Sequence, residues 1–199
     1  MPTTESQFDA IGLRVAGCSA PIFDAVLELA VEIAREGREG RRIGTLFTIA
    51  HADAVLAASR PLILDPLAGH PPAVRRVSDG SVRGTVKELA QLDGAFVIDD
   101  EGVVVAACRY LNASADDVDL PLGLGSRHLA AASISLRTGA LAIVVSESAV
   151  VRVFQHGALI AEVLPELWLL GRYHPQLRGH IQTQHLRDVA ILTSDRHDS

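Results

Sequence analysis

The chain has 199 residues, of which 48% are hydrophobic and 21% charged, and its formal net charge at pH 7 is −6. This length exceeds one typical domain of about 150 residues but falls short of two, so we expect a single core that needs no disulfides. The longest apolar runs have about six residues, as at 140–145, against the roughly 20 that a membrane-spanning helix requires. The acidic balance argues against a general nucleic-acid binder, which needs a basic face.

The N-terminal segment and the cysteines carry no sign of export. The segment MPTTESQFDA lacks the basic and apolar regions of a secretory signal, so we expect a cytoplasmic protein that binds neither nucleic acid nor a membrane. Cys18 and Cys108 lie far apart and have no partner at metal-ligand spacing, which predicts free structural thiols. His180 and His185 are five positions apart and do not match a helical metal pair, so we expect them to be structural or solvated.

The first part of the chain predicts an arm, a helix and a strand. Residues 1–18 show no sustained periodicity, which predicts a loosely attached arm. From 23 to 34, apolar side chains recur at the spacing of one helix face, and Gly37 and Gly40 end the pattern. The segment 43–49, IGTLFTI, is rich in β-branched and aromatic residues and predicts a strand in the sheet interior.

The middle of the chain predicts a loop, a helix and a hairpin. Four prolines within 61–72 indicate a surface loop. Helical spacing returns over 82–92. Two apolar runs, 95–98 and 103–110, are joined by the polar turn DDEG, which predicts a β-hairpin.

A third helix and three more strands follow a polar link. The run after Ser126, RHLAAASIS, has small side chains that suit a helix packed closely on a sheet, and Gly139 ends it. The apolar run 140–145 is typical of a strand buried on both faces. The runs 150–154 and 158–163 predict a second hairpin.

The order of these elements predicts the fold class. Helices and strands are interleaved without strict βαβ alternation, which favours an α/β fold with a mixed central β-sheet flanked by helices, in a single domain. We place this domain at residues 19–170, between the N-terminal arm at 1–18 and a C-terminal extension at 171–199.

The first candidate functional segment is Asp93-Gly94-Ala95. Asp93 stands where a predicted helix ends and a buried strand begins, and the two small residues after it leave space for a ligand to approach the backbone. The alternative is a simple turn that terminates the helix.

The second candidate is the loop that leads into the third helix. Gly123, Gly125 and Ser126 precede a helix N-terminus, where free N–H groups and the helix dipole favour an anion. The loop could also be only a turn followed by an N-cap. Arg127 and His128 are cations that oppose the dipole unless an anion lies between them, which favours a phosphate.

Two further sets of polar residues remain. Ser146-Glu147-Ser148 places a carboxylate at the end of the most buried strand, and ligands of such folds bind at the ends of strands. Arginines also cluster at 38–42 and at 75–76, where solvated surface charge is the ordinary explanation.

Together these motifs resemble a known family. The chain resembles the diadenylate cyclase domain of bacteria and archaea, the DisA N-terminal type, over about residues 23–165. The resemblance is carried by Asp93-Gly94-Ala95, by Gly125-Ser126-Arg127-His128 and by Ser146-Glu147. It implies an enzyme that joins two ATP molecules into cyclic di-AMP, a second messenger, and releases two pyrophosphates. It also implies Mg²⁺ or Mn²⁺ as cofactor and a face-to-face homodimer or higher homo-oligomer.

The resemblance also implies roles for individual residues. Asp93 would activate the 3′-hydroxyl or orient the divalent ion, and Gly94 and Ala95 would let the ribose approach. Gly125, Ser126 and Arg127 would grip the phosphates. Ser146 would belong to the substrate site, and His128 and Glu147 would contact phosphate or metal. Leu111 would contact adenine. The implied catalytic residues are Asp93, Arg127 and His128, and the implied metal ligands are Asp93 and His128.

Two positions depart from the family pattern. Many members have arginine at the position of Leu129 and glutamate at that of Ser148, so one phosphate-binding cation and one carboxylate are missing. Because Asp93 is present, we expect retained activity. The alternative is a catalytically weak or inactive nucleotide-binding module that acts as a sensor or dimerisation partner.

Overall fold

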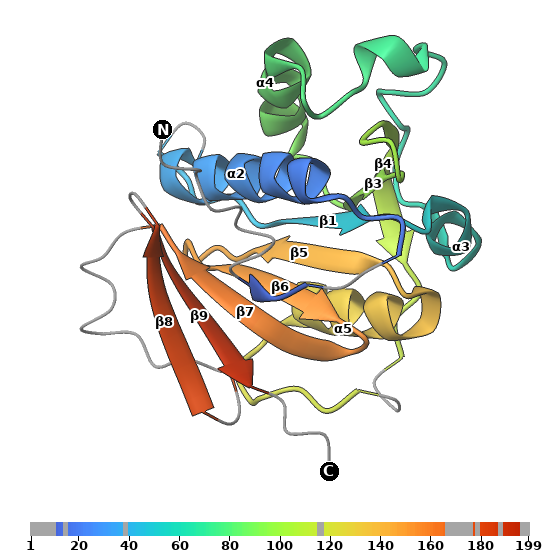
Figure 1. The fold of residues 1–199 in the computed structure, drawn as a ribbon. Helices are drawn as coiled ribbons and strands as arrows, with labels where there is room; N and C mark the ends of the chain where they lie inside the picture. The colour runs from blue at the N-terminus through green and yellow to red at the C-terminus, as the bar shows by residue number, and fades with distance from the viewer. Residues whose placement is uncertain are drawn as a thin grey trace.

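The computed structural model describes residues 11–13, 16–37, 40–114, 118–165, 177, 180–186 and 189–195. Its strands are β1 (Thr45–Ile49), β2 (Ser59–Pro61), β3 (Ala95–Ile98), β4 (Val104–Leu111), β5 (Leu141–Val145), β6 (Val151–Gln155), β7 (Ala158–Leu164), β8 (His180–Leu186) and β9 (Val189–Asp195). Its helices are α2 (Ala20–Glu36), α3 (Ala52–Ala57), α4 (Gly80–Leu89) and α5 (Ser126–Thr138), with a short 3₁₀ helix, η1 (Pro72–Val74). The strands form one sheet in the order β2-β4-β3-β1-β5-β6-β7-β9-β8 (Figure 1).

The central strand β1 pairs with neighbours of both directions. It runs parallel to β3, with Leu46 opposite Ala95, and antiparallel to β5, with Thr45 opposite Val145. The remaining pairs of named strands are antiparallel. The expected α/β fold, a mixed central sheet flanked by helices, is therefore confirmed.

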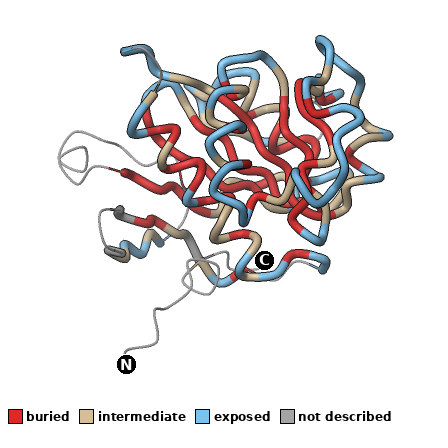
Figure 2. Tube along the Cα trace, turned by 90° about the horizontal axis from the view of Figure 1, so that it is seen from above, coloured by how far each residue is buried: buried red, intermediate tan, exposed pale blue. Residues whose placement is uncertain are grey.

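Two hydrophobic cores lie on opposite faces of this sheet. Helix α2 covers one face and α5 the other (Figure 1). The α2 side receives large side chains from the central strands, including Phe47, Ile49, Phe96, Leu141 and Ile143. On the other side, Ala131 and Ala132 of α5 are fully buried against the sheet, so the predicted close packing of a small-residue helix is confirmed. Buried residues run through the whole interior (Figure 2).

Most predicted elements are present near their expected bounds. The three predicted helices are α2, α4 and α5, and both hairpins appear, as β3–β4 and β6–β7. The sequence did not predict α3 or β2. Helix α3 has six residues, too few for a periodic pattern. Strand β2 is a three-residue edge strand that contains Pro61, which an edge tolerates because its outer side is unpaired.

Segments expected outside the domain also contribute to the sheet and the core. Leu13 is 1% exposed and Cys18 is 9% exposed, both in the α2-side core, so these parts of the predicted arm are not loosely attached. Strands β8 and β9 belong to the predicted extension, yet β9 pairs with β7 and continues the sheet. The polar sequence of β8, HIQTQHL, lacks the apolar alternation by which strands are found.

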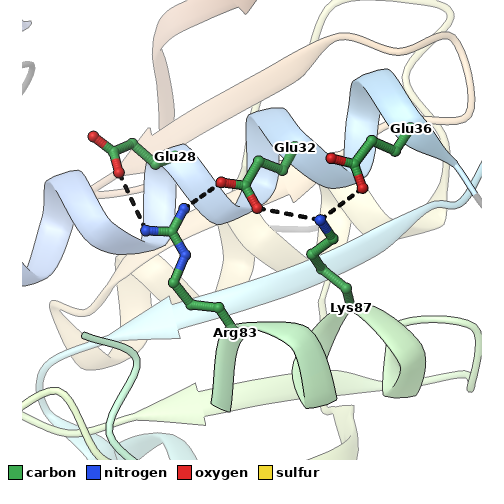
Figure 3. A network of polar contacts seen from close by, with 5 residues as sticks. All are labelled: Glu28, Glu32, Glu36, Arg83 and Lys87. Carbon is green, nitrogen blue, oxygen red and sulfur yellow. Dashed lines mark hydrogen bonds and ion pairs between the residues drawn. The ribbon is translucent and has the colours of Figure 1, made fainter. Parts of the chain in front are cut away.

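A charged network joins α4 to α2 (Figure 3). Arg83 pairs with Glu28 at 3.2 Å and with Glu32 at 2.5 Å, and Lys87 pairs with Glu32 at 3.3 Å and with Glu36 at 2.6 Å. The Glu36 carboxylate, its main partner, raises the pKa of Lys87. An isolated exposed pair contributes little, but several charges in a network hold two elements together more firmly. This network fixes α4, whose end leads directly to Asp93.

A second polar group is buried on the α5 side of the sheet. Arg152 on β6 donates from Nε to Glu162 Oε1 on β7 at 2.7 Å, and its Nη1 lies 3.2 Å from His128 Nε2 on α5. All three residues are less than 10% exposed. Because arginine can only donate, the histidine nitrogen accepts this bond. Burial, together with the charge of Arg152, lowers the pKa of His128 to about 4, so its imidazole is neutral at pH 7.

This neutral histidine predicts a pH dependence of stability. The folded pKa lies below the ordinary value of 6.5, so the unfolded chain binds the proton first as the pH falls through 6.5 toward 4. The free energy of unfolding should then fall by roughly 3 kcal/mol from this residue alone. Urea unfolding at pH 7 and pH 4 should show a smaller loss for His128→Asn than for the unsubstituted protein. Equal losses in the two proteins would contradict the assignment.

Candidate functional site

The three candidate motifs meet at one end of the central strands. Because β1 and β3 are parallel and β5 is antiparallel to them, the starts of β1 and β3 lie beside the end of β5. Asp93 precedes β3, Gly44 precedes β1 and Glu147 follows β5. The first turn of α5 brings Arg127 to the same end. The topology therefore assembles residues that are far apart in the sequence.

Arg127 connects two of these loops. Its Nη2 lies 3.3 Å from Asp93 Oδ1, and its Nη1 lies 3.2 Å from Glu147 Oε1. The side chains of Asp93 and Glu147 are 79% and 70% exposed, whereas that of Arg127 is 39% exposed. Both carboxylates are thus open to solvent and to an incoming ligand.

Gly44 is a site residue that the sequence did not reveal. A Cβ atom at this position would lie 2.7 Å from Arg127 Nη1 and 3.3 Å from Glu147 Cγ. Any side chain there would displace the guanidinium from its place between the carboxylates. The requirement comes from tertiary contact, and the segment IGTLF contains no local signal of it.

A cavity of about 400 Å³ lies beside Arg127. Its lining includes most of the predicted substrate residues: Asp93, Gly94, Ala95, Leu111, Ser126 and Arg127. Leu129 also lines it, so the position that departs from the family pattern faces the candidate site.

The lining of the cavity combines apolar and polar side chains. Leu46, Ala95 and Leu111 are each at most 5% exposed and form apolar wall. Tyr110 lines the cavity as well, and the guanidinium of Arg60 stacks on its ring at 4.4 Å from the centroid. Asp93, Ser126 and Arg127 are polar members of the lining. A ligand with a flat apolar part and a charged part fits this combination.

Position 94 requires glycine because the backbone of the neighbouring strand β4 lies too close for a Cβ atom. Its φ is +113°, and a Cβ atom would lie 2.6 Å from Cys108 Cα and 2.5 Å from Cys108 C. Cys108 itself has φ +53°, at an irregularity in the pairing of β3 with β4. The sequence predicted that a ligand would approach the backbone closely at Gly94. In the structure, the backbone of Cys108 already lies close to Gly94.

Cys108 and Cys18 are free and buried, as the sequence predicted.

A second cavity of about 270 Å³ continues from the first, since both are lined by Asp93 and Arg127. Its further lining includes Arg41, Arg42, Gln91 and Glu147. The sequence alone suggested that Arg41 and Arg42 are solvated surface charge; they are exposed, but they also face this cavity. Their charges make it suitable for an anion.

Three predicted site residues, Gly125, His128 and Ser146, line neither of these two cavities. His128 is turned toward the sheet, where its Nε2 accepts a hydrogen bond from Arg152 Nη1. It is neutral, so only Arg127 opposes the dipole of α5. Ser146 lies in the turn before Glu147, where its Oγ is 2.6 Å from Ser148 Oγ and accepts a bond from the Ser148 N–H. Ser146 and Ser148 thus shape the turn that presents Glu147. Gly125 is the N-cap of α5, and its carbonyl accepts from the His128 and Leu129 N–H groups.

The donor set for a divalent metal ion is sparse but chemically suitable. Among the described residues, no group of three or more His, Cys, Asp and Glu side chains could hold a metal. Asp93 and Glu147 nevertheless offer two exposed carboxylates on either side of Arg127. Mg²⁺ in nucleotide sites is bound by one or two carboxylates and by substrate phosphates, so these two residues fit such an ion.

The helices in the described part of the chain are short or polar relative to a bilayer. None of them combines the length and apolar character that crossing a membrane requires.

Several known proteins are similar to this chain. A curated protein from Methanocaldococcus jannaschii, "Diadenylate cyclase", is 49% identical over 146 residues, which are 73% of this chain and 46% of that protein. A protein of the same name from Haloferax volcanii is 44% identical over 144 residues, or 72% of this chain and 52% of its own length. The chain thus spans about half the length of these relatives.

Two solved structures and a family model are also similar to it. A double mutant of DacA from Staphylococcus aureus has a TM-score of 0.47 and 22% identity, over 70% of this chain and 84% of its own. A hypothetical membrane spanning protein from Bacillus cereus has a TM-score of 0.49 and 21% identity, over 76% of this chain and 66% of its own. The family model described as "DisA bacterial checkpoint controller nucleotide-binding" matches residues 32–159. Because that match covers more than half of the 199 residues, the chain belongs to the DAC family, as its motifs indicated.

Proposed function

We propose that this protein is a diadenylate cyclase, a nucleotidyltransferase that condenses two ATP molecules into cyclic di-AMP and releases two pyrophosphates. The observation that carries the proposal is Arg127, which pairs with two exposed carboxylates and lines a cavity that also has an apolar wall. The names of the two curated relatives support the same reaction.

We place one nucleotide in this cavity. Its adenine lies against Leu111, and its ribose lies near Gly94 and Ala95; all three residues line the cavity. The α-phosphate lies at Ser126 and Arg127, where the first N–H groups of α5 point toward it. The remaining phosphates extend into the second cavity, toward Arg41 and Arg42.

The chemistry is an in-line substitution at phosphorus. A 3′-oxygen forms a bond to the α-phosphorus of the other nucleotide, the bond from that phosphorus to the β-phosphate oxygen breaks, and pyrophosphate leaves. Asp93 accepts the proton of the 3′-hydroxyl or orients a divalent ion. Arg127 stabilises the charge on the phosphate oxygens. Asp93 and Glu147, together with the phosphates, would hold Mg²⁺ or Mn²⁺, which would supply further charge neutralisation.

Each nucleotide must meet a second one, because the product contains two. The cavity that Asp93, Ser126 and Arg127 line in the described part of one copy is proposed to hold one nucleotide, so we propose that two copies face each other in a homodimer or higher homo-oligomer. We further propose that the protein acts in the cytoplasm, on ATP rather than on a nucleic acid. The direct test is incubation of the purified protein with ATP and either Mg²⁺ or Mn²⁺, followed by chromatography for cyclic di-AMP.

The substitution Asp93→Asn should abolish product formation. It removes the base or metal ligand and preserves the size of the side chain, so ATP affinity should stay within about tenfold, or about 1.4 kcal/mol. Turnover and ATP affinity are measured together. Asp53→Asn is a matched control, because Asp53 is an exposed carboxylate on α3, beyond the opposite end of β1. Normal turnover in Asp93→Asn would remove Asp93 from the mechanism.

The substitution Arg127→Ala should weaken the binding of ATP and leave that of adenosine nearly unchanged. A charge-assisted bond to phosphate contributes about 1.5–3 kcal/mol, and adenosine has no phosphate. Isothermal titration with both ligands measures the difference. Arg137→Ala, in the last turn of the same helix, is the control. Equal losses for the two ligands would assign Arg127 a structural role only.

The substitution Leu129→Arg should lower the KM for ATP. Leu129 lines the cavity and is partly exposed, so an arginine there reaches the phosphates without being buried. Binding that is equal in the ground and transition states changes KM first, so turnover should remain close to that of the unsubstituted protein. Steady-state kinetics and thermal unfolding are measured on the same preparation. A folded variant with an unchanged KM would show that this position does not contact phosphate.

A further inference from the structure

The first turn of α5 lacks the usual local means of holding its position. Its N-cap is Gly125, which provides no side-chain hydrogen bond. A Ser, Thr, Asp or Asn side chain at this point would accept a hydrogen bond from the first turn. Gly123, just upstream, has φ +94°, and a Cβ atom added there would have no neighbour within 4 Å. The position of Arg127 must therefore be determined by contacts from elsewhere in the fold.

The neighbouring residue on the helix, His128, makes those contacts. Its Nε2 lies 3.2 Å from Arg152 Nη1. Its ring also meets the Phe154 ring edge to face, at 6.2 Å between centroids. Both partners are on β6, and His128 is 8% exposed. The first turn of α5 is thus fastened to the sheet on the side opposite the cavity.

Arg152 is itself held in one orientation. Glu162 Oε1 accepts from its Nε at 2.7 Å, and Glu162 is fully buried on β7. Leu192 of β9 pairs with Glu162 on the far side of that strand. A buried ion pair has a high desolvation cost and is a poor source of stability. Its geometric effect is clear: the planar guanidinium presents Nη1 to His128 from a fixed direction.

We propose that Arg152 is a positioning residue for phosphate binding, acting through His128 to hold Arg127 at the cavity. The proposal rests on the proposed function in one respect: the phosphates it positions are those of ATP. Arg152 lines neither of the two cavities, and it contacts His128, which follows Arg127 on α5. Its effect should therefore fall on phosphate binding. The residues proposed to contact adenosine belong to β3, β4 and the loop before β3, and their contacts should be independent of Arg152.

The double substitution Arg152→Met with Glu162→Leu tests this directly. Removing both members of a buried ion pair in favour of apolar side chains is often neutral or stabilising, whereas His128 loses its partner. We expect a melting temperature near that of the unsubstituted protein, an ATP affinity lower by at least fivefold and an unchanged adenosine affinity. The KM for ATP should rise more than kcat falls. The control is Arg76→Met with Glu101→Leu, the same chemical change in an exposed ion pair of 3.0 Å at the β3–β4 turn, which should alter neither affinity.

A second variant keeps the proposal testable if the double variant does not fold. Arg152→Lys keeps a charge opposite Glu162 and lacks the forked nitrogen that reaches His128, so it should give the same selective loss for ATP. Normal ATP affinity in either folded variant would overturn the proposal, and so would equal losses of ATP and adenosine. Because both readouts are equilibrium affinities, they remain decisive if the unsubstituted protein makes no cyclic di-AMP. That last result would refute the proposed function alone.

Discussion

The ion pairs of Arg127 are the interaction on which the rest of the site depends. One guanidinium links the loop before β3 to the loop after β5, and the missing side chain of Gly44 makes room for it. Two carboxylates around one arginine leave the group with a net negative charge. A polyphosphate bound to Arg127, as proposed, would therefore also be repelled by the two carboxylates. Charges outside the group would offset this repulsion: those of the arginines of the second cavity, the N-terminus of α5 and a divalent ion.

Much of the site could be predicted from the sequence because its motifs stand at boundaries between elements. Asp93 marks a change from helical to extended spacing, and Glu147 follows a long apolar run; both signals are local. The role of Gly44 could not be predicted, because it depends on a side chain more than 80 residues away. The orientation of His128 depends in the same way on Arg152, which adjacent sequence does not reveal. In the fold, α3 and β2 were too short for periodicity, and β8 was too polar.

The cavity also illustrates how one irregular pair of residues shapes a binding surface. In a regular strand, consecutive side chains point to opposite faces, yet Arg109, Tyr110 and Leu111 all line the same cavity. The left-handed backbone of Cys108 and the glycine opposite it interrupt the pairing just before these residues. Such bulges strengthen the local twist and redirect side chains.

The charged network between α2 and α4 has a consequence for the way the protein responds to its solvent. Salt screens exposed charges over about 8 Å at physiological ionic strength, and the glutamates of this network are 38–55% exposed. Helix α4 ends four residues before Asp93. Ionic strength should thus act on this site by two routes: it should screen the charges that would attract the proposed nucleotide, and it should weaken the ion pairs that hold the helix preceding Asp93.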